Sequence, residues 1–113
     1  MRSSWLLLMV ASLIGCATPA HYAWGQYEDL VYDSYAKPGA TPPEKQVEKL
    51  EEDYQKARST NKPVPPGWHA HLGYLYFQLG KSDQARQEFE TEKATFPESA
   101  VFMDRLLAKF EKR

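Results

Sequence analysis

The sequence has little cysteine and no excess of charge of either sign, and both shortages exclude functions. One Cys in 113 residues excludes an internal disulfide and any zinc site built from several thiolates. Fourteen Lys and Arg against fifteen Asp and Glu leave a net charge of -1, whereas a nucleic-acid-binding domain needs a basic excess to neutralise phosphates. Strict apolar and polar alternation is absent too, so the sequence predicts no β-strand and an all-α fold.

Groups that carry out chemistry are equally sparse. His69 and His71 are two residues apart, which places their side chains about 200° apart around a helix, so they cannot share a metal ion. His21 stands alone, and the sequence has neither a glycine-rich phosphate loop nor a nucleophile elbow. We therefore expect no catalytic residue, no metal site and no enzyme. A haem or other cofactor held by a histidine and the aromatic residues is a less favoured alternative.

What the sequence does contain begins with an apolar leader. A short positive start precedes an eleven-residue apolar run from Trp5 to Gly15. A membrane-spanning helix needs about 20 apolar residues, so the run predicts a signal peptide over residues 1–15. The sequence LIGC at residues 13–16 resembles the bacterial lipobox. The alternative is a signal peptide that ends near a buried cysteine by chance.

The lipobox resemblance implies that Cys16 is acylated and that the chain is cut before it. Several acyl chains make an essentially permanent membrane anchor, so the covalent lipid on Cys16 is the only cofactor that we expect. Ala17 follows at the position where Asp is the usual signal for retention in the inner membrane. The resemblance therefore implies a protein anchored by lipid on the periplasmic face of the outer membrane, with the inner membrane as the alternative.

Removing residues 1–15 leaves 98 residues, which is one small domain at most. Residues 16–23 form the acylated Cys and a short tether, and residues 24–113 form the domain. The seven residues between Cys16 and Trp24 reach roughly 25 Å when fully extended, so the domain must lie close to its own membrane. This geometry disfavours a protein that crosses the cell wall and favours an accessory subunit of an outer-membrane assembly.

Proline clusters divide the domain into five predicted helices. We expect them at Trp24 to Tyr35, Glu44 to Thr60, Gly67 to Leu79, a helix that Ser82 caps and that runs to Thr95, and Ala100 to Lys112. Thr41 as N-cap, Pro42 at the first helical position and Glu44 predict a capping box at the start of the second helix. Ser99 is the expected N-cap of the fifth helix.

The third and fourth helices carry a spacing of small and aromatic residues that is similar to the tetratricopeptide repeat, a 34-residue helix-turn-helix unit. The unit runs from residue 66 to 99, and its matching residues are Leu72, Gly73, Tyr76, Gly80, Ala85, Phe89 and Pro97. The resemblance implies that the small residues let the two helices approach closely and that Gly80 makes the turn. Two positions depart from the pattern: His69 replaces the usual Trp, and Glu92 replaces a second small residue.

One repeat cannot bury its own faces, and about three are needed for an independent solenoid. Residues 24–57 are therefore expected to form a degenerate earlier unit, and residues 100–112 a capping helix that closes the array. The residues that this capping helix is expected to turn inward are Phe102, Met103, Leu106, Leu107 and Phe110.

The tetratricopeptide frame also predicts a groove for a partner on the first helix of the repeat. The residues that it places there are His71, Tyr74, Phe77 and Gln78, next to Ala70. Two aromatic rings suit an apolar helix or an extended peptide, which His71 and Gln78 would orient. The alternative is that the aromatic residues of the first helix cover these rings. The aromatic residues between Tyr22 and Phe77 are too many for so small a core, which favours an exposed binding surface.

Nearly the whole mature chain also resembles a family of small Gram-negative lipoproteins of unknown function. The resemblance rests on WGxYEDL at residues 24–30, YxxY at 32–35, PPGWHAHLGYLY at 65–76 and FPESAVFM at 96–103. Members are commonly encoded beside a lipoprotein similar to the curli secretion channel subunit and another small lipoprotein. The resemblance therefore implies membership of an envelope complex of three lipoproteins.

These features predict a non-enzymatic adaptor or accessory subunit of such an envelope complex. Its expected partners are proteins at the outer membrane, including other lipoproteins, and the membrane itself through the anchor, but not nucleic acid. An activator or regulator of peptidoglycan synthesis is the first alternative, and an enzyme or cofactor binder is the second.

Overall fold

The computed structural model describes residues 21–111, and the predicted all-α fold is confirmed over this range. Its helices are α1 (Tyr27–Ala36), α2 (Pro43–Ser59), α3 (Trp68–Gln78), α4 (Ser82–Thr95), the short 3-10 helix η1 (Pro97–Ser99) and α5 (Ala100–Glu111). No strand occurs within these described residues. The predicted signal peptide and Cys16 lie outside the described range, as does Lys112 at the predicted end of the fifth helix.

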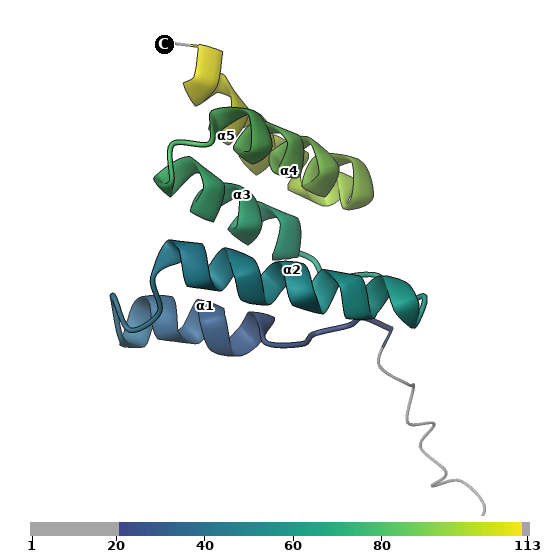
Figure 1. Cartoon of the computed structure of the whole chain (residues 1–113). Helices are drawn as coiled ribbons and strands as arrows, with labels where there is room; N and C mark the ends of the chain where they lie inside the picture. The colour runs from purple at the N-terminus through teal and green to yellow at the C-terminus, as the bar shows by residue number, and fades with distance from the viewer. Residues whose placement is uncertain (1–20, 112–113) are drawn as a thin grey trace, which may run out of the picture.

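The helices stack in chain order as two antiparallel pairs with α5 added at the end (Figure 1). The first pair is α1 with α2, and the second is α3 with α4. Helix α3 packs on α2, and α5 packs on α4. Loops 37–42 and 79–81 therefore lie at one end of the stack, while the loop at 60–67 and η1 lie at the other.

The core is a continuous apolar cluster to which all five α-helices contribute. Its most deeply buried side chains are Leu50, Trp68, Leu75, Ala85 and Met103. The Trp68 ring stacks on Tyr54 of α2 with ring centroids 5.4 Å apart, so α3 is fixed on α2 by an aromatic pair. The two pairs therefore bury apolar side chains against each other.

Helix α1 begins three residues later than the sequence predicts. Gly25 has a φ of +49°, a left-handed conformation that stops the helix from starting at Trp24. A Cβ atom at Gly25 would lie 2.4 Å from a carboxylate oxygen of Asp53, so the close approach of α2 also requires glycine there. The first helical residue is consequently Tyr27.

Both helix pairs begin in the same way, on a buried carboxylate supplied by the second helix of the pair. In the first pair, Asp53 accepts a hydrogen bond from the Gln26 backbone N–H at 2.7 Å. In the second pair, Glu92 accepts hydrogen bonds from the backbone N–H groups of Gly67 at 2.7 Å and Ala70 at 3.3 Å. Each carboxylate accepts hydrogen bonds from N–H groups that have no partner within the helix they begin. Each also lies at the N-terminus of that helix, the positive end of the helix dipole. Neither of these caps was predicted from the sequence.

None of the three predicted side-chain caps forms its capping hydrogen bond. The N-cap of α2 is Pro42, with Pro43 at the first helical position, and no side chain caps the helix, so Thr41 and Glu44 form no capping box. Ser82 is the first residue of α4, whose N-cap is Lys81. Ser99 directly precedes α5, as predicted, but its hydroxyl donates to the Phe96 carbonyl at 2.7 Å, at the C-terminal end of α4.

Helix α5 covers the open side of α4 as expected, with one exception. Met103 is buried, and Leu106, Leu107 and Phe110 pack partly buried against the core. Phe102 was expected to face inward, but it is 59% exposed. It lies in the first turn of α5, directly after η1.

Candidate partner-binding site

The residues of the predicted repeat signature lie mainly between α3 and α4. Leu72, Gly73 and Tyr76 of α3 are buried, as are Ala85 and Phe89 of α4. A Cβ atom at Gly73 would lie 2.7 Å from Phe89 Cε1 and 3.2 Å from the Ala85 carbonyl oxygen. Only glycine therefore lets these two helices approach so closely.

Gly80 and Pro97 lie at the two ends of α4. Gly80 has a φ of +74°. Its N–H donates to the Phe77 carbonyl, and the next N–H, of Lys81, donates to the Tyr76 carbonyl. This pair of bonds is a Schellman motif, which ends α3 sharply and turns the chain into α4. Pro97 is exposed and begins η1.

The buried polar side chains of Glu92 and His69, near the start of α3, have partners inside the domain. Glu92 occupies the position where a small residue was expected, and its carboxylate caps α3 as described above. His69 occupies the usual Trp position, and its Nδ1 lies 2.6 Å from a Glu88 carboxylate oxygen. Both side chains thus use their polar atoms inside the domain.

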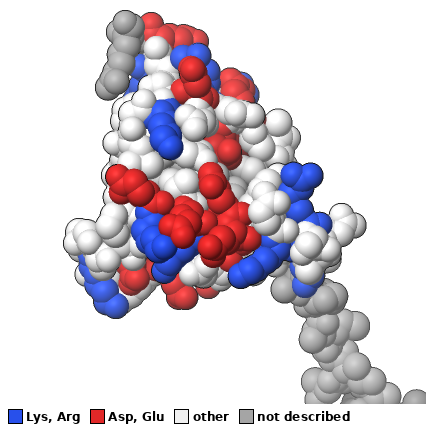
Figure 2. Space-filling model, in the orientation of Figure 1, with Lys and Arg blue, Asp and Glu red and all other residues white. Residues whose placement is uncertain are grey.

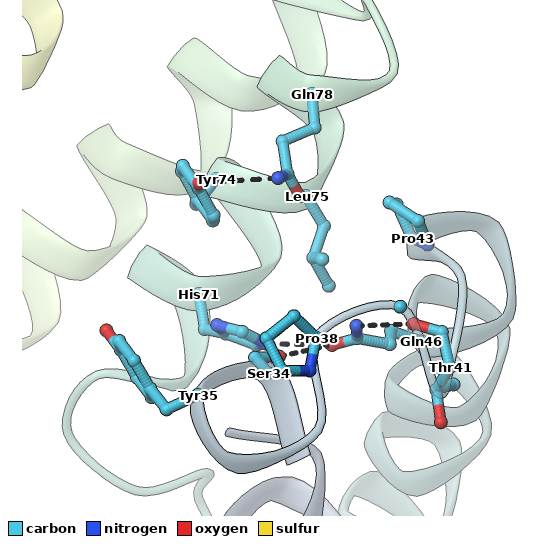
Figure 3. A pocket seen from close by; sticks show the side chains of 11 residues that line it. Ser34, Tyr35, Pro38, Thr41, Pro43, Gln46, His71, Tyr74, Leu75 and Gln78 are labelled. Atoms are coloured by element: carbon cyan, nitrogen blue, oxygen red, sulfur yellow. Dashed lines mark hydrogen bonds between the residues drawn. The ribbon is translucent and has the colours of Figure 1, made fainter. Parts of the chain in front are cut away.

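Three of the four predicted groove residues line one hollow of about 410 Å³. This hollow, the first hollow, lies between α3 and the loop joining α1 to α2 (Figure 3). Its α3 side is formed by His71, Tyr74, Leu75 and Gln78. Its other side is formed by Ser34, Tyr35, Pro38, Gly39, Thr41, Pro43 and Gln46. None of these lining residues carries a formal charge, apart from what His71 gains on protonation.

The buried side-chain amide of Gln46 forms hydrogen bonds with residues on both sides of the first hollow. The Gln46 side-chain N–H donates to the Thr41 carbonyl at 2.9 Å, which fixes the orientation of the amide. Its oxygen then faces His71 Nε2 at 3.2 Å and the Ser34 hydroxyl at 3.3 Å. Ser34 also donates to the Leu30 carbonyl at the shorter distance of 2.8 Å. Gln46 therefore connects α1, α2 and α3 in one network.

This network and the burial of the ring determine the tautomer and the protonation of His71. Because the Gln46 oxygen is an acceptor, Nε2 of His71 carries the proton and Nδ1 is left as an acceptor. Burial lowers the pKa of His71 below its ordinary value, since the charged ring loses hydration. The edge of the ring also meets Tyr27 of α1, with ring centroids 6.1 Å apart. The site thus holds a neutral imidazole at neutral pH.

Phe77, the fourth predicted groove residue, lies in a separate hollow. This second hollow, of about 80 Å³, is lined by Tyr74, Phe77, Phe89, Leu106, Lys109 and Phe110. Phe77 is half-buried, and its ring meets Phe110 of α5 with centroids 5.7 Å apart. Tyr74 borders both hollows and is 53% exposed. The structure therefore places a ridge at Tyr74 where the sequence predicted one continuous groove.

The aromatic residues of α1 do not cover Tyr74. Tyr27 is the α1 ring that packs against His71 of α3, and burial raises its pKa. Tyr32 and Tyr35 are 65% and 84% exposed. Tyr35 borders the first hollow, whereas Tyr32 borders neither. The alternative that α1 covers the predicted groove therefore applies to the His71 ring but not to Tyr74.

A further polar contact joins α3 to α2. The Tyr76 hydroxyl donates to Glu51 at 2.5 Å, and burial raises the pKa of Tyr76. Within residues 21–111, no group of three His, Cys, Asp or Glu side chains is placed to hold a metal ion. Over the same part of the chain, no helix has the length and apolar character needed to cross a membrane.

The comparisons with known proteins place these features in a family. The model of a family described as "Domain of unknown function (DUF4810)" matches residues 21–106, which include all of α1 to α4 and the first half of α5. No curated protein and no solved structure matches the chain.

Proposed function

The chain belongs to the DUF4810 family, and on this premise we propose that it is a lipid-anchored outer-membrane protein that binds another protein and carries out no catalysis. Its partner is another envelope protein, such as a lipoprotein similar to the curli secretion channel subunit. A two-pair tetratricopeptide-like stack with α5 as its cap presents the binding surface.

One observation carries this proposal: Tyr74 forms an exposed ridge between two hollows on one face of α3. A tyrosine that is half exposed and flanked by concave surface is the usual form of an interface hot spot, because a partner can remove it from water on both sides. The first hollow is large enough for a side chain or a short peptide segment.

The chemistry of the two hollows indicates which kind of partner surface fits. The first hollow has uncharged polar groups on its floor and tyrosines at its border. The second is apolar except for Lys109. A helix or extended segment with apolar and amide side chains would satisfy both, with Gln78 and the free nitrogen of His71 as orienting groups. A strongly charged partner segment would lose hydration in the first hollow without gaining an ion pair.

The anchor supports the outer-membrane part of the proposal. The lipobox resemblance at residues 13–16 and the short tether hold the domain near the membrane, where other lipoproteins are concentrated. Confinement to the same membrane raises the effective concentration of the two proteins, so a modest interface suffices.

Photocrosslinking in living cells tests the proposal. A benzophenone amino acid replaces Tyr35, which borders the first hollow, or Tyr32, which is also exposed but borders neither hollow. We expect a defined protein adduct from position 35 and none from position 32, with the partner identified by mass spectrometry. A lipoprotein partner supports the proposal. A penicillin-binding protein would instead support a regulator of peptidoglycan synthesis, and a bound small molecule a cofactor binder.

Loss of the Tyr74 ring should weaken partner capture selectively. Tyr74→Ala removes the ridge between the hollows and is expected to lower affinity roughly 5- to 30-fold, which corresponds to about 1–2 kcal/mol for a hot-spot residue. Tyr32→Ala is the matched control and should leave capture unchanged. Pulldown with the tagged, lipidated chain measures both, after circular dichroism has shown that both variants fold. Equal capture by wild type and Tyr74→Ala would exclude the ridge as the binding surface.

A further inference from the structure

Aromatic and exposed apolar side chains gather at the end of the stack that contains residue 21. We call it the tether edge, and it consists of residues 21–26, the loop at 60–67, η1 and the first turn of α5 (Figure 1). The Ala23 N–H donates to the Pro63 carbonyl at 2.8 Å, which holds the segment before α1 against this loop. The tether edge is therefore a fixed part of the domain.

An aromatic cluster runs across the tether edge. The Tyr22 ring meets Trp24 with centroids 6.4 Å apart and Phe96 with centroids 6.2 Å apart. Tyr22 thus connects the segment before α1 to the C-terminal end of α4. Trp24 remains 39% exposed, although its ring also approaches Tyr27. Trp and Tyr favour the interface between water and lipid, where the ring body is apolar and its polar group stays hydrated.

Further exposed apolar side chains lie at the same end. Val101 in the first turn of α5 is 67% exposed, and Phe102 beside it is exposed as well. The exposed prolines of the edge are Pro63, Pro66 and Pro97. The charges of the connecting segments are mixed, since Arg58 and Lys62 are exposed near the end of α2 and Glu98 is exposed in η1. Apolar contact, more than net charge, therefore distinguishes this edge.

The length of the chain before the described residues limits how far this edge can lie from a lipid anchor. Four residues separate Cys16 from His21 in the sequence. Five residue steps span at most roughly 18 Å from one Cα atom to the other. If Cys16 carries acyl chains, as the proposed function requires, the tether edge is the part of the domain that must approach the membrane.

We propose that the tether edge lies on the membrane surface, with Trp24 in the headgroup region of the bilayer. This inference rests on the lipid anchor of the proposed function and adds the orientation of the domain. The helix axes then stand away from the membrane. The first hollow, at the other end of α2, is held off the bilayer by roughly 25 Å, the length of a 17-residue helix. The binding surface thus faces the periplasm.

The tryptophans of the processed chain allow a direct test of this orientation. Trp5 lies in the predicted signal peptide, so the processed protein contains Trp24, which is partly exposed, and Trp68, which is buried. The full lipidated protein is purified from envelopes and reconstituted into vesicles of phosphatidylethanolamine and phosphatidylglycerol, with and without brominated acyl chains. We expect brominated lipid to quench the emission of the wild type but not that of Trp24→Phe, which reports Trp68 alone.

A second variant places a probe at the opposite end of the stack. Tyr35→Trp in the Trp24→Phe background adds an exposed indole beside the first hollow, and brominated lipid should leave its emission unchanged. Quenching at both positions would mean that the domain lies on its side and would overturn the orientation. Unchanged Trp24 emission in protein that floats with the vesicles would overturn the inference and leave the anchor intact. Failure to float would instead overturn the anchor, and with it both proposals.

Discussion

At the scale of single residues, two buried carboxylates in the described part of the chain cap the N-termini of helices. Asp53 and Glu92 each accept hydrogen bonds from backbone N–H groups at the start of another helix. Both are buried, and a buried carboxylate is stable only when such donors satisfy it. The two carboxylates therefore fix where α1 and α3 begin, and through α3 they fix where the Tyr74 ridge lies.

Replacing Glu92 by Gln should destabilise the domain by about 1–2 kcal/mol. The amide has nearly the shape of the carboxylate, but it loses the charge that faces the α3 dipole and turns one NH₂ group toward the backbone donors. Urea unfolding followed by circular dichroism measures the change. Glu90→Gln, an exposed position on the same helix, is the control and should change stability by less than about 0.5 kcal/mol. Equal stability of both variants would contradict the capping role of Glu92.

His71 should make the stability depend on pH. Its pKa in the folded protein is lowered from 6.5 by burial, so the unfolded chain binds the proton first as the pH falls. The contribution of His71 is therefore complete above about pH 6.5 and is lost as the pH falls below that value. Free energies of unfolding at pH 8, 7, 6 and 5 test this for wild type and His71→Gln. We expect the advantage of the wild type to shrink at low pH, and a constant difference would contradict the assignment.

At the scale of elements, α3 contacts each of the other four described α-helices. It packs on α2 through the Trp68 and Tyr54 rings and on α4 through the close approach at Gly73. It also lines both hollows. A change in the α3–α4 contact is therefore expected to reach the binding surface through the Phe89 ring, which lines the second hollow as well.

Gly73→Ala should cost about 1–3 kcal/mol, because its methyl group would overlap the Phe89 ring in a packed interior. Phe89→Leu alone should also destabilise by leaving unfilled volume. The double variant should be more stable than the sum of the two losses predicts, since the smaller side chain makes room for the methyl group. A double-mutant cycle from urea unfolding measures this coupling. Additive losses would show that the two positions do not compete for the same space.

At the scale of the whole molecule, the domain has two different ends. The tether edge carries the aromatic cluster around Trp24, and the other end carries the first hollow. Asp and Glu side chains gather across the middle of the face seen in Figure 2. With the proposed anchor, the first hollow, whose lining residues carry no formal charge, would face away from the membrane.

The anchor itself can be tested in cells. Cys16→Ala removes the predicted acylation site, so the variant should lose palmitate labelling and should no longer fractionate with the outer membrane, because no lipid holds it there. Cys16→Ala protein that still fractionates with the outer membrane would exclude the lipid anchor. Ala17→Asp, next to the acylation site, is expected to keep the palmitate label and move the protein to the inner membrane.

The local features of the sequence were sufficient to predict the fold class and the number of helices. Three kinds of signal act within a few residues: the helical spacing of apolar side chains, the prolines between the helices, and the glycine at position 80. Their effects on the backbone can therefore be predicted from short stretches of sequence. The same reasoning failed for Thr41, Ser82 and Ser99. Many residues can cap a helix in principle, and the competing partners come from elsewhere in the chain.

By itself, then, the sequence determined the all-α class of residues 21–111 and the five α-helices described there. Only the tertiary structure decided that Asp53 and Glu92 cap helices and that Phe77 lies apart from His71. It also brought residues 34–46 together with residues 71–78 to form the first hollow. The reason is physical: helix formation depends on neighbours three or four residues apart, whereas these caps and this hollow join segments more than twenty residues apart.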